Sequence, residues 1–150
     1  MSDVVIENIM LLPLLIMTLI LFPIAANSVV VTYISQQNEI VAQSAMNQIV
    51  STVQQLYYSL NREDIMACNI TMAKPFPQKI GSYEYYVDAK MNPNSLTLSL
   101  SMPGMNFALN KTISLSSNAL WIDSQLRSTS PSAAINAQKL SNGTLVFNFG

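Results

Sequence analysis

The chain opens on a long run of apolar positions. Between Val4 and Ile34 the only polar residues are Glu7, Asn8, Thr18, Asn27, Ser28 and Thr32. The run exceeds the roughly 20 residues that cross the hydrocarbon core of a bilayer. Each central Leu, Ile, Val or Phe favours insertion by about 0.3 to 0.6 kcal/mol. Residues 4–34 are therefore expected to form an apolar helix that enters lipid readily.

Helical periodicity continues after this run. Residues 35–60 contain no Gly or Pro, and one stripe of them is apolar. The stripe comprises Ile40, Val41, Ala45, Ile49, Val53, Leu56, Tyr57 and Leu60, with Gln36, Gln43, Asn47, Ser51 and Gln54 opposite. The pattern predicts one helix from about residue 3 to residue 60, roughly 87 Å long at 1.5 Å per residue. We expect a first segment, residues 1–60, that is apolar over 4–34 and amphipathic over 35–60.

A helix of this length cannot lie wholly in a bilayer, nor wholly in a domain built from the about 90 residues that follow it. Its amphipathic half is expected to need other partners, either lipids or the same half-helices of neighbouring copies. Pro13 and Pro23 each remove one backbone donor and are expected to bend or loosen the helix. They are either ordinary transmembrane prolines or places where neighbouring helices fill the gap.

The helix contains six candidate residues for contacts with neighbouring helices, namely Asp3, Glu7, Ile16, Asn27, Ser28 and Thr32. Side chains such as Asn27 can bond across helices, at about 0.6 kcal/mol per contact, whereas Ser and Thr can also bond back to their own helix. Asp3 and Glu7 lie one turn apart at the positive end of the helix, which stabilises acids there. The alternative is that one of them meets the α-amino group of an adjacent copy and sets the stagger between subunits.

After Asn61 the hydrophobic period changes from 3.6 to 2. The segment "SLTLSLSM", Ser95 to Met102, alternates strictly between apolar and polar positions, as a half-buried strand does. Turn signals at "NPNS", "PGMN" and "NG" separate further strand-like segments spaced about 10 residues apart. The chain is therefore predicted to be α+β, with a long hydrophobic N-terminal α-helix followed by a small antiparallel β-sandwich (Ig-like) head over residues 61–150.

Charge is distributed unevenly along the chain. No Lys or Arg precedes Arg62, and the earlier charges, Asp3, Glu7 and Glu39, are all acidic. A single-pass helix is normally oriented by basic residues near its cytoplasmic end, and a signal peptide opens with a basic region. Either Met1 is the initiator of a charge-poor anchor, or a basic leader has been cut away.

Composition argues against several classes of function. A pI near 5.1 with seven scattered basic residues gives no patch for binding nucleic acid. The chain has no His and a single cysteine, Cys68, which excludes zinc sites, c-type haem and Ser-His-Asp chemistry within one chain. Cys68 is either reactive or, as is commoner, a small buried hydrophobe. With no paired carboxylates at a useful spacing, we expect no enzyme, no cofactor and no small-molecule substrate.

Three patterns for N-glycosylation occur, at Asn69, Asn110 and Asn142. Chance alone predicts about as many in a chain of this composition, so their number decides nothing. All three fall after residue 61, where a secreted domain carries sugar. Carbohydrate on the head is therefore a prediction for mass measurement.

The opening "SDVVIENIMLLPLLI", Ser2 to Ile16, is similar to the start of archaeal type IV pilins, whose class III signal peptide is removed just before such a segment, and that family resembles archaellins. Ser2, Val4 and Val5 match this start, whereas Asp3 and Met1 depart from it. The resemblance implies a membrane-inserted precursor that is cut by a prepilin peptidase and polymerised by an assembly machinery. It further implies an extracellular cell-surface filament, a helical homo-oligomer with helices in its core and β heads outside, used for adhesion.

A second hypothesis is a single-pass membrane-anchored extracellular β-domain protein, either a receptor or an archaellum-stator-like subunit, that binds a partner in the cell envelope. An enzyme anchored by the helix is a distant third. The unbroken amphipathic helix over 35–60 and the missing basic flanks favour the filament. A head-to-tail contact that does not close into a ring also yields a fibre.

Overall fold

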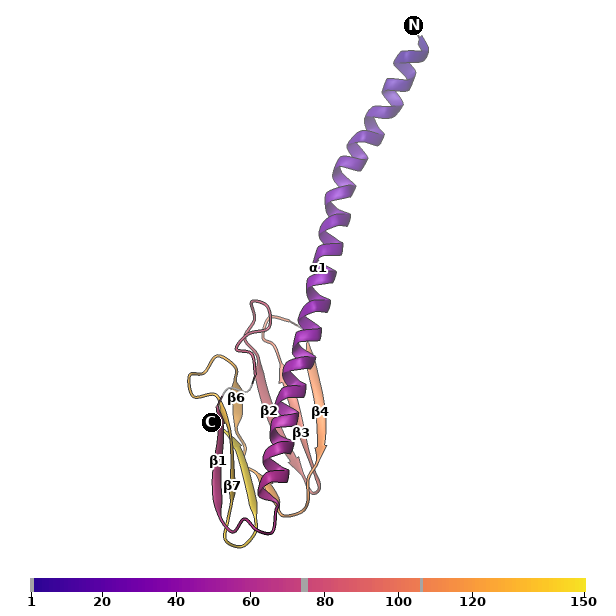
Figure 1. Ribbon diagram of the computed structural model, residues 1–150. Helices are drawn as coiled ribbons and strands as arrows, with labels where there is room; N and C mark the ends of the chain where they lie inside the picture. Colours follow the sequence, from indigo (N-terminus) through magenta and orange to yellow (C-terminus); the bar gives the residue numbers. More distant parts are fainter. Residues whose placement is uncertain (1, 74–75, 106) are drawn as a thin grey trace. The chain divides into compact units, whose positions relative to one another are not determined.

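The computed structural model describes residues 2–73, 76–105 and 107–150, and it describes the side chains of the first helix from Leu11 onward (Figure 1). Within these residues, one α-helix, α1 (Ser2–Leu60), precedes eight β-strands. The predicted α+β class, with a long apolar helix followed by a β head, is confirmed. The chain divides into two compact units, Met1–Glu39 and Ile40–Gly150.

The head contains two four-stranded sheets. In spatial order the first consists of β1 (Cys68–Ala73), β7 (Ala134–Lys139), β8 (Leu145–Phe149) and β5 (Ala119–Trp121). The second consists of β4 (Ala108–Ser114), β3 (Ser95–Ser101), β2 (Tyr86–Asn92) and β6 (Gln125–Arg127). Strands β2, β3 and β4 follow one another in the second sheet, and β7 and β8 pair in the first. The chain changes sheet after β1, β4, β5 and β6, which brings distant segments into one core.

Strand β3 illustrates why these residues form a sheet. Leu96, Leu98 and Leu100 are buried, and the Thr and Ser residues between them are only partly covered. Because successive side chains of a strand point to opposite faces, strict alternation directs one face into the core. The strand predicted from "SLTLSLSM" is confirmed over Ser95–Ser101, and it forms a hairpin with β2 in which Asn92 pairs with Ser95.

One strand pair departs from the expected antiparallel arrangement. Strands β5 and β8 pair in parallel, with Leu120 opposite Val146, whereas every other pair of strands that the structure describes is antiparallel. After β5 the chain crosses to the second sheet as β6 and returns through β7 before it reaches β8. A crossover of this kind allows parallel pairing, which a hairpin between neighbouring strands does not.

The second half of α1 forms part of the head's core. Its buried side chains are Ala42, Ala45, Met46, Ile49, Val53, Leu56, Tyr57 and Leu60, which cluster with buried residues of both sheets. In Figure 1 the last turns of the helix lie against the strands of the head. The expectation that this half needs partners outside its own domain is wrong, because the two sheets already cover its apolar stripe.

The buried stripe also differs in part from the predicted one. Ile40 and Val41 are 59% and 38% exposed, while Ala42 and Met46 are fully buried in their place. Because residues 40–60 share the core of the sheets, the compact unit that contains the head begins at Ile40. The sequence interpretation placed the start of the head at residue 61, where the hydrophobic period changes.

Polar contacts attach the end of α1 to loops of the head. The hydroxyl of Tyr57 hydrogen-bonds Ser116 Oγ at 2.6 Å and accepts the backbone N–H of Ser116 at 3.3 Å. The amide of Asn118 donates to Asn61 Oδ1 at 3.3 Å. The last turn of α1 contains no basic residue, and Lys139 Nζ donates to the carbonyl of Arg62 just beyond it at 2.7 Å. These contacts connect the end of α1 and the residues just after it to Ser116, Asn118 and Lys139 of the head.

Candidate functional site

The first compact unit presents an uncovered apolar helix. Every large hydrophobic side chain between Leu11 and Ile34 is between 49% and 75% exposed, with Ile16 the least and Phe22 the most exposed. Fully covering such a side chain contributes about 1.5 to 3 kcal/mol. Covering the whole segment is thus worth on the order of tens of kcal/mol, so the segment needs an apolar partner from outside the chain or from a membrane.

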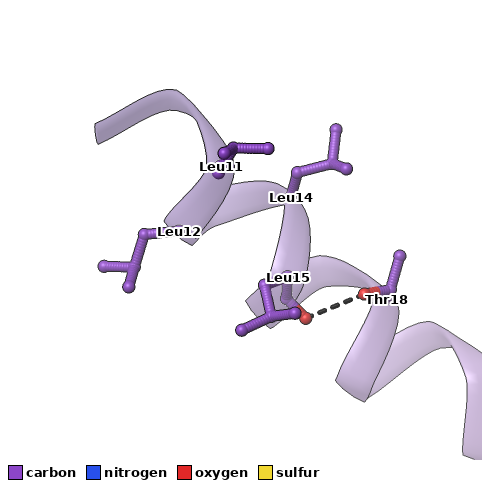
Figure 2. Close-up of a pocket in the computed structure, with 5 residues that line it drawn as sticks. All are labelled: Leu11, Leu12, Leu14, Leu15 and Thr18. Atoms are coloured by element: carbon purple, nitrogen blue, oxygen red, sulfur yellow. Dashed lines mark hydrogen bonds between the residues drawn. The ribbon is translucent and has the colours of Figure 1, made fainter. Parts of the chain in front are cut away.

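Hollows along this segment are shallow grooves between side chains of one helix. Leu11, Leu12, Leu14, Leu15 and Thr18 line one of them, and all five come from α1 (Figure 2). Figure 2 shows the leucine side chains pointing outward from the helix in several directions. Such a groove offers a seat for side chains of another helix or for acyl chains, whereas small-molecule sites are concave and bury most of their ligand.

The two threonine hydroxyls of this segment bond to their own helix. Thr18 Oγ1 donates to the carbonyl of Leu15 at 2.9 Å, and Thr32 Oγ1 donates to the carbonyl of Ser28 at 2.8 Å. Thr32 could bond either to a neighbouring helix or to a carbonyl of its own helix, and the structure shows the second. Its hydroxyl therefore needs no partner from another helix.

Asn27 differs from these hydroxyl residues. Its side chain is exposed, and within the described residues its amide makes no hydrogen bond. An amide carries two donors and an acceptor that a helix does not satisfy by itself. Asn27 and Ser28 are both exposed in the single chain, so contact with another helix stays a prediction for them.

For the remaining helix residues singled out in the sequence, the structure gives mainly their position in α1. Asp3 and Glu7 lie within α1, but their side chains are outside the described part of the structure. Pro13 and Pro23 are inside the helix, which continues through both. Because Pro23 has no N–H, the carbonyl of Leu19 lacks its usual partner four residues later.

All three sequon asparagines are exposed on the head. Asn69 lies on β1 and Asn110 on β4, which are edge strands of the two sheets. Asn142 lies in the turn between β7 and β8, where its Oδ1 accepts the backbone N–H of Thr144 at 3.0 Å and Gly143 adopts a φ of 83°. Exposure meets one requirement for glycosylation, and the modification itself stays a prediction.

The most connected charged group of the head is Glu84. Its Oε2 accepts hydrogen bonds from Arg127 Nε at 3.1 Å, Arg127 Nη2 at 3.0 Å and Thr129 Oγ1 at 3.0 Å, and its Oε1 accepts one from the Tyr86 hydroxyl at 3.0 Å. Hydrogen bonds from Arg127, then Thr129 and Tyr86, hold the pKa of Glu84 below its usual value of 4.5. A carboxylate with this many donors and a lowered pKa is a poor proton acceptor near neutral pH.

The Tyr85 hydroxyl is hydrogen-bonded and the Cys68 side chain is packed against the core. Burial raises the pKa of Tyr85, whose hydroxyl donates to the carbonyl of Pro77 at 2.5 Å. Cys68 is half-buried and packs against the core. Among the described residues, no group of three or more His, Cys, Asp or Glu side chains could hold a metal ion.

The feature that sequence reasoning missed is the attachment of α1 to the head. Tyr57 and Ser116 are 59 residues apart, and no local pattern relates them.

Comparison with protein-family models, with curated proteins and with solved structures finds no match to this chain. By length and composition, α1 over Leu11–Leu60 is long and apolar enough to cross a membrane, with a mean hydropathy of 2.4 in its most apolar window.

Proposed function

We propose that this chain is a structural subunit of an extracellular filament similar to type IV pili. The observation that supports the proposal is the apolar segment Leu11–Ile34, whose large side chains are all uncovered although the head has a complete core of its own. In the filament, these segments pack against one another and the heads form the outer surface. Adhesion through the heads is the proposed role.

Like helices are suitable partners for one another here. The segment from Leu11 to Ile34 contains no charged residue, so identical copies pack without like-charge repulsion. The amide of Asn27 gains a partner in such a bundle, because an apolar surrounding makes an unpaired amide costly. A contact between different faces of identical subunits propagates into a fibre unless it closes into a ring.

The route to the filament follows from the resemblance of residues 2–16 to archaeal type IV pilins. The precursor is held in the cytoplasmic membrane by the apolar segment, is processed by a prepilin peptidase and is then polymerised at the cell surface. Lipid covers the apolar side chains before assembly, and neighbouring helices cover them afterwards.

A second candidate is a membrane-anchored protein whose head binds a partner in the cell envelope. The observation that favours it is the hydropathy of α1, which suits a membrane span as well as a filament core. In this case the apolar segment stays in lipid, and the chain does not polymerise.

The test compares two substitutions of the same type at different places. Ile16 lies in the apolar segment and is 49% exposed, whereas Ile122 lies on the head and is 56% exposed. Cells producing the wild type, Ile16→Lys or Ile122→Lys are sheared, the appendages are pelleted, and the pellet is examined by electron microscopy and mass spectrometry, including its amino-terminal peptide.

We expect the wild type and Ile122→Lys to form uniform fibres in which this chain is the main protein, and Ile16→Lys to form none. Thermal unfolding of both variants in detergent shows whether the head is intact. Normal fibres from Ile16→Lys would contradict packing through this segment. A wild-type chain found only in detergent-extracted membranes would instead favour the anchored protein.

A further inference from the structure

A cluster of polar side chains joins the start of β2 to the end of β6. This Glu84 cluster consists of Glu84, Tyr86, Arg127 and Thr129, and the other three residues donate to the Glu84 carboxylate over distances of 3.0 or 3.1 Å. The side chains of Arg127 and Glu84 are 57% and 33% exposed, and an isolated ion pair at such positions contributes little to stability. Here, however, four hydrogen bonds from two separate segments of the chain converge on one carboxylate.

The segment that the cluster holds has little apolar burial of its own. Strand β6 is three residues long, pairs with β2 at three positions and buries one side chain, Leu126. The turn 128–133 then leads to β7 in the other sheet, and its sequence is "STSPSA". In this turn only Ser128 and Ala133 are buried. A segment with few buried apolar contacts opens at a lower free energy than the core strands do, so its closure depends on polar contacts.

Backbone hydrogen bonds of the turn lie next to the cluster in the sequence. The N–H of Ser128 donates to the carbonyl of Tyr85 at 3.1 Å, and the N–H of Tyr85 donates to Ser128 Oγ at 3.1 Å. The N–H of Ser130 donates to the carbonyl of Arg127 at 3.0 Å. Glu84 directly precedes Tyr85, and the residue that follows Ser128 belongs to the cluster as well. The amides of Ser128 and Ser130 therefore report on whether the turn is closed.

Glu84 is the member of the cluster that changes charge in acid. Between about pH 3 and pH 6, Arg127 stays positive and Tyr86 stays neutral. Hydrogen bonds from Arg127, then Thr129 and Tyr86, lower the pKa of Glu84 from its usual 4.5, so the carboxylate loses its charge only as the pH falls below that value. The next acid along β2, Asp88, accepts a hydrogen bond from Gln125 at 2.8 Å. Hydrogen bonds to a charged carboxylate are about twice as strong as those between neutral groups, so protonation weakens the whole cluster.

We infer that the Glu84 cluster is an acid-sensitive contact that holds the turn 128–133 closed. With Glu84 charged, the turn is fixed to the start of β2. With Glu84 neutral, the turn and the end of β6 open, while the rest of the two sheets stays paired. Strand β3 is expected to be unaffected, because it pairs with β2 and β4 on its two sides and buries three leucines. The inference concerns a single chain and does not depend on the proposed filament.

The experiment is amide hydrogen exchange on the full chain in detergent, at about pH 6 and about pH 3. Each rate is divided into the rate of an unstructured peptide at the same pH, so that the intrinsic effect of pH on exchange cancels. The reporters are the amides of Ser128 and Ser130, and the reference is the amide of Leu98 in β3. We expect the protection of both reporters to fall at least tenfold between pH 6 and pH 3, and that of Leu98 to stay constant.

Two variants identify the group that responds to pH. Glu84→Gln is neutral at both pH values, so its reporters are expected to have low protection at both. Asp88→Asn makes the same type of change on the same strand and is expected to behave as the wild type.

Constant protection of the reporters in the wild type would overturn the inference, and this comparison needs no variant. An equal fall at Leu98 would overturn it too, because the whole head would then be unfolding. So would a fall that persists in Glu84→Gln or one that disappears in Asp88→Asn.

Discussion

Removing residues 1–60 is expected to unfold the head, whereas removing residues 1–39 leaves it folded. The difference between the two fragments is the segment of α1 whose buried side chains belong to the head's core. The large aliphatic ones are Met46, Ile49, Val53, Leu56 and Leu60. At about 1.5 to 3 kcal/mol for each, their burial contributes about 8 to 15 kcal/mol. A domain of this size has a net stability of about 5 to 15 kcal/mol, so losing the segment removes most or all of it.

The assay is urea unfolding of the fragments 40–150 and 61–150, followed by circular dichroism and by the fluorescence of Trp121. Trp121 is 8% exposed and contacts Phe147 and Phe149, so its emission reports on the core. We expect one cooperative transition for 40–150 and none for 61–150. Within 40–150, Ile49→Ala is expected to lower the free energy of unfolding by about 2 to 5 kcal/mol.

The matched control is Ser51→Ala on the exposed side of the same helix, which is expected to change the free energy of unfolding by at most about 0.5 kcal/mol. The reasoning would be refuted by cooperative unfolding of 61–150 at the same urea midpoint as 40–150. Equal effects of Ile49→Ala and Ser51→Ala would also contradict it, because they would mean that the helix is not packed on the sheets as described.

Three further predictions concern single groups of the head. Tyr57→Phe removes the hydroxyl that bonds Ser116 and is expected to lower the free energy of unfolding by about 1 to 2 kcal/mol; an unchanged urea midpoint would contradict this. The pKa of Glu84 is lower in the folded protein than its usual 4.5, so its ion contacts stabilise the head above about pH 4.5 and the stabilisation is lost as the pH falls through the lower folded value. Glu84→Gln is therefore expected to destabilise the head at pH 7 and to flatten the loss of stability on acidification, as measured by urea midpoints at both ends of that range. Carbohydrate is expected to raise the intact mass of the chain from its native host, and replacing Asn69, Asn110 and Asn142 by Gln is expected to abolish the excess; a wild-type mass equal to that of the bare sequence would refute it.

The sequence predicted those elements in which one face is buried. Alternation in Ser95–Ser101 and helical spacing after Ala45 both follow from burial of a single face, so the pattern is visible locally. Periodicity does not show what covers an apolar face. The pattern of residues 40–60 therefore led to a prediction of partners outside the domain, whereas the head's own sheets cover these residues. Strands β5 and β6 are only three residues long, and the parallel pairing of β5 with β8 depends on a crossover that no local pattern records.

The sequence predicts where the apolar segment of the candidate site lies, but it does not predict which hydrogen bonds its polar side chains make. An uncharged apolar run identifies Leu11–Ile34 as a segment that seeks an apolar partner. Whether a hydroxyl such as that of Thr32 turns to its own helix or to a neighbour depends on its geometry, and the structure places it 2.8 Å from the carbonyl of Ser28. The amide of Asn27 has no such local partner among the described residues. Of these two polar groups, Asn27 is thus the one through which the helix can gain a bond on assembly.

Different segments of α1 serve the folding of the head and the proposed assembly, so the two can be perturbed separately. Side chains such as Ile49 and Leu60 already contribute their burial to the head, so they have no apolar surface left for a neighbour. The longest run of uncovered apolar side chains is that of Leu11–Ile34, and we expect assembly to depend on it. A substitution in the head's core is expected to reduce both the stability of the head and the yield of fibres. A substitution at Ile16 is expected to reduce the yield of fibres alone. A membrane anchor that does not polymerise would not produce this contrast.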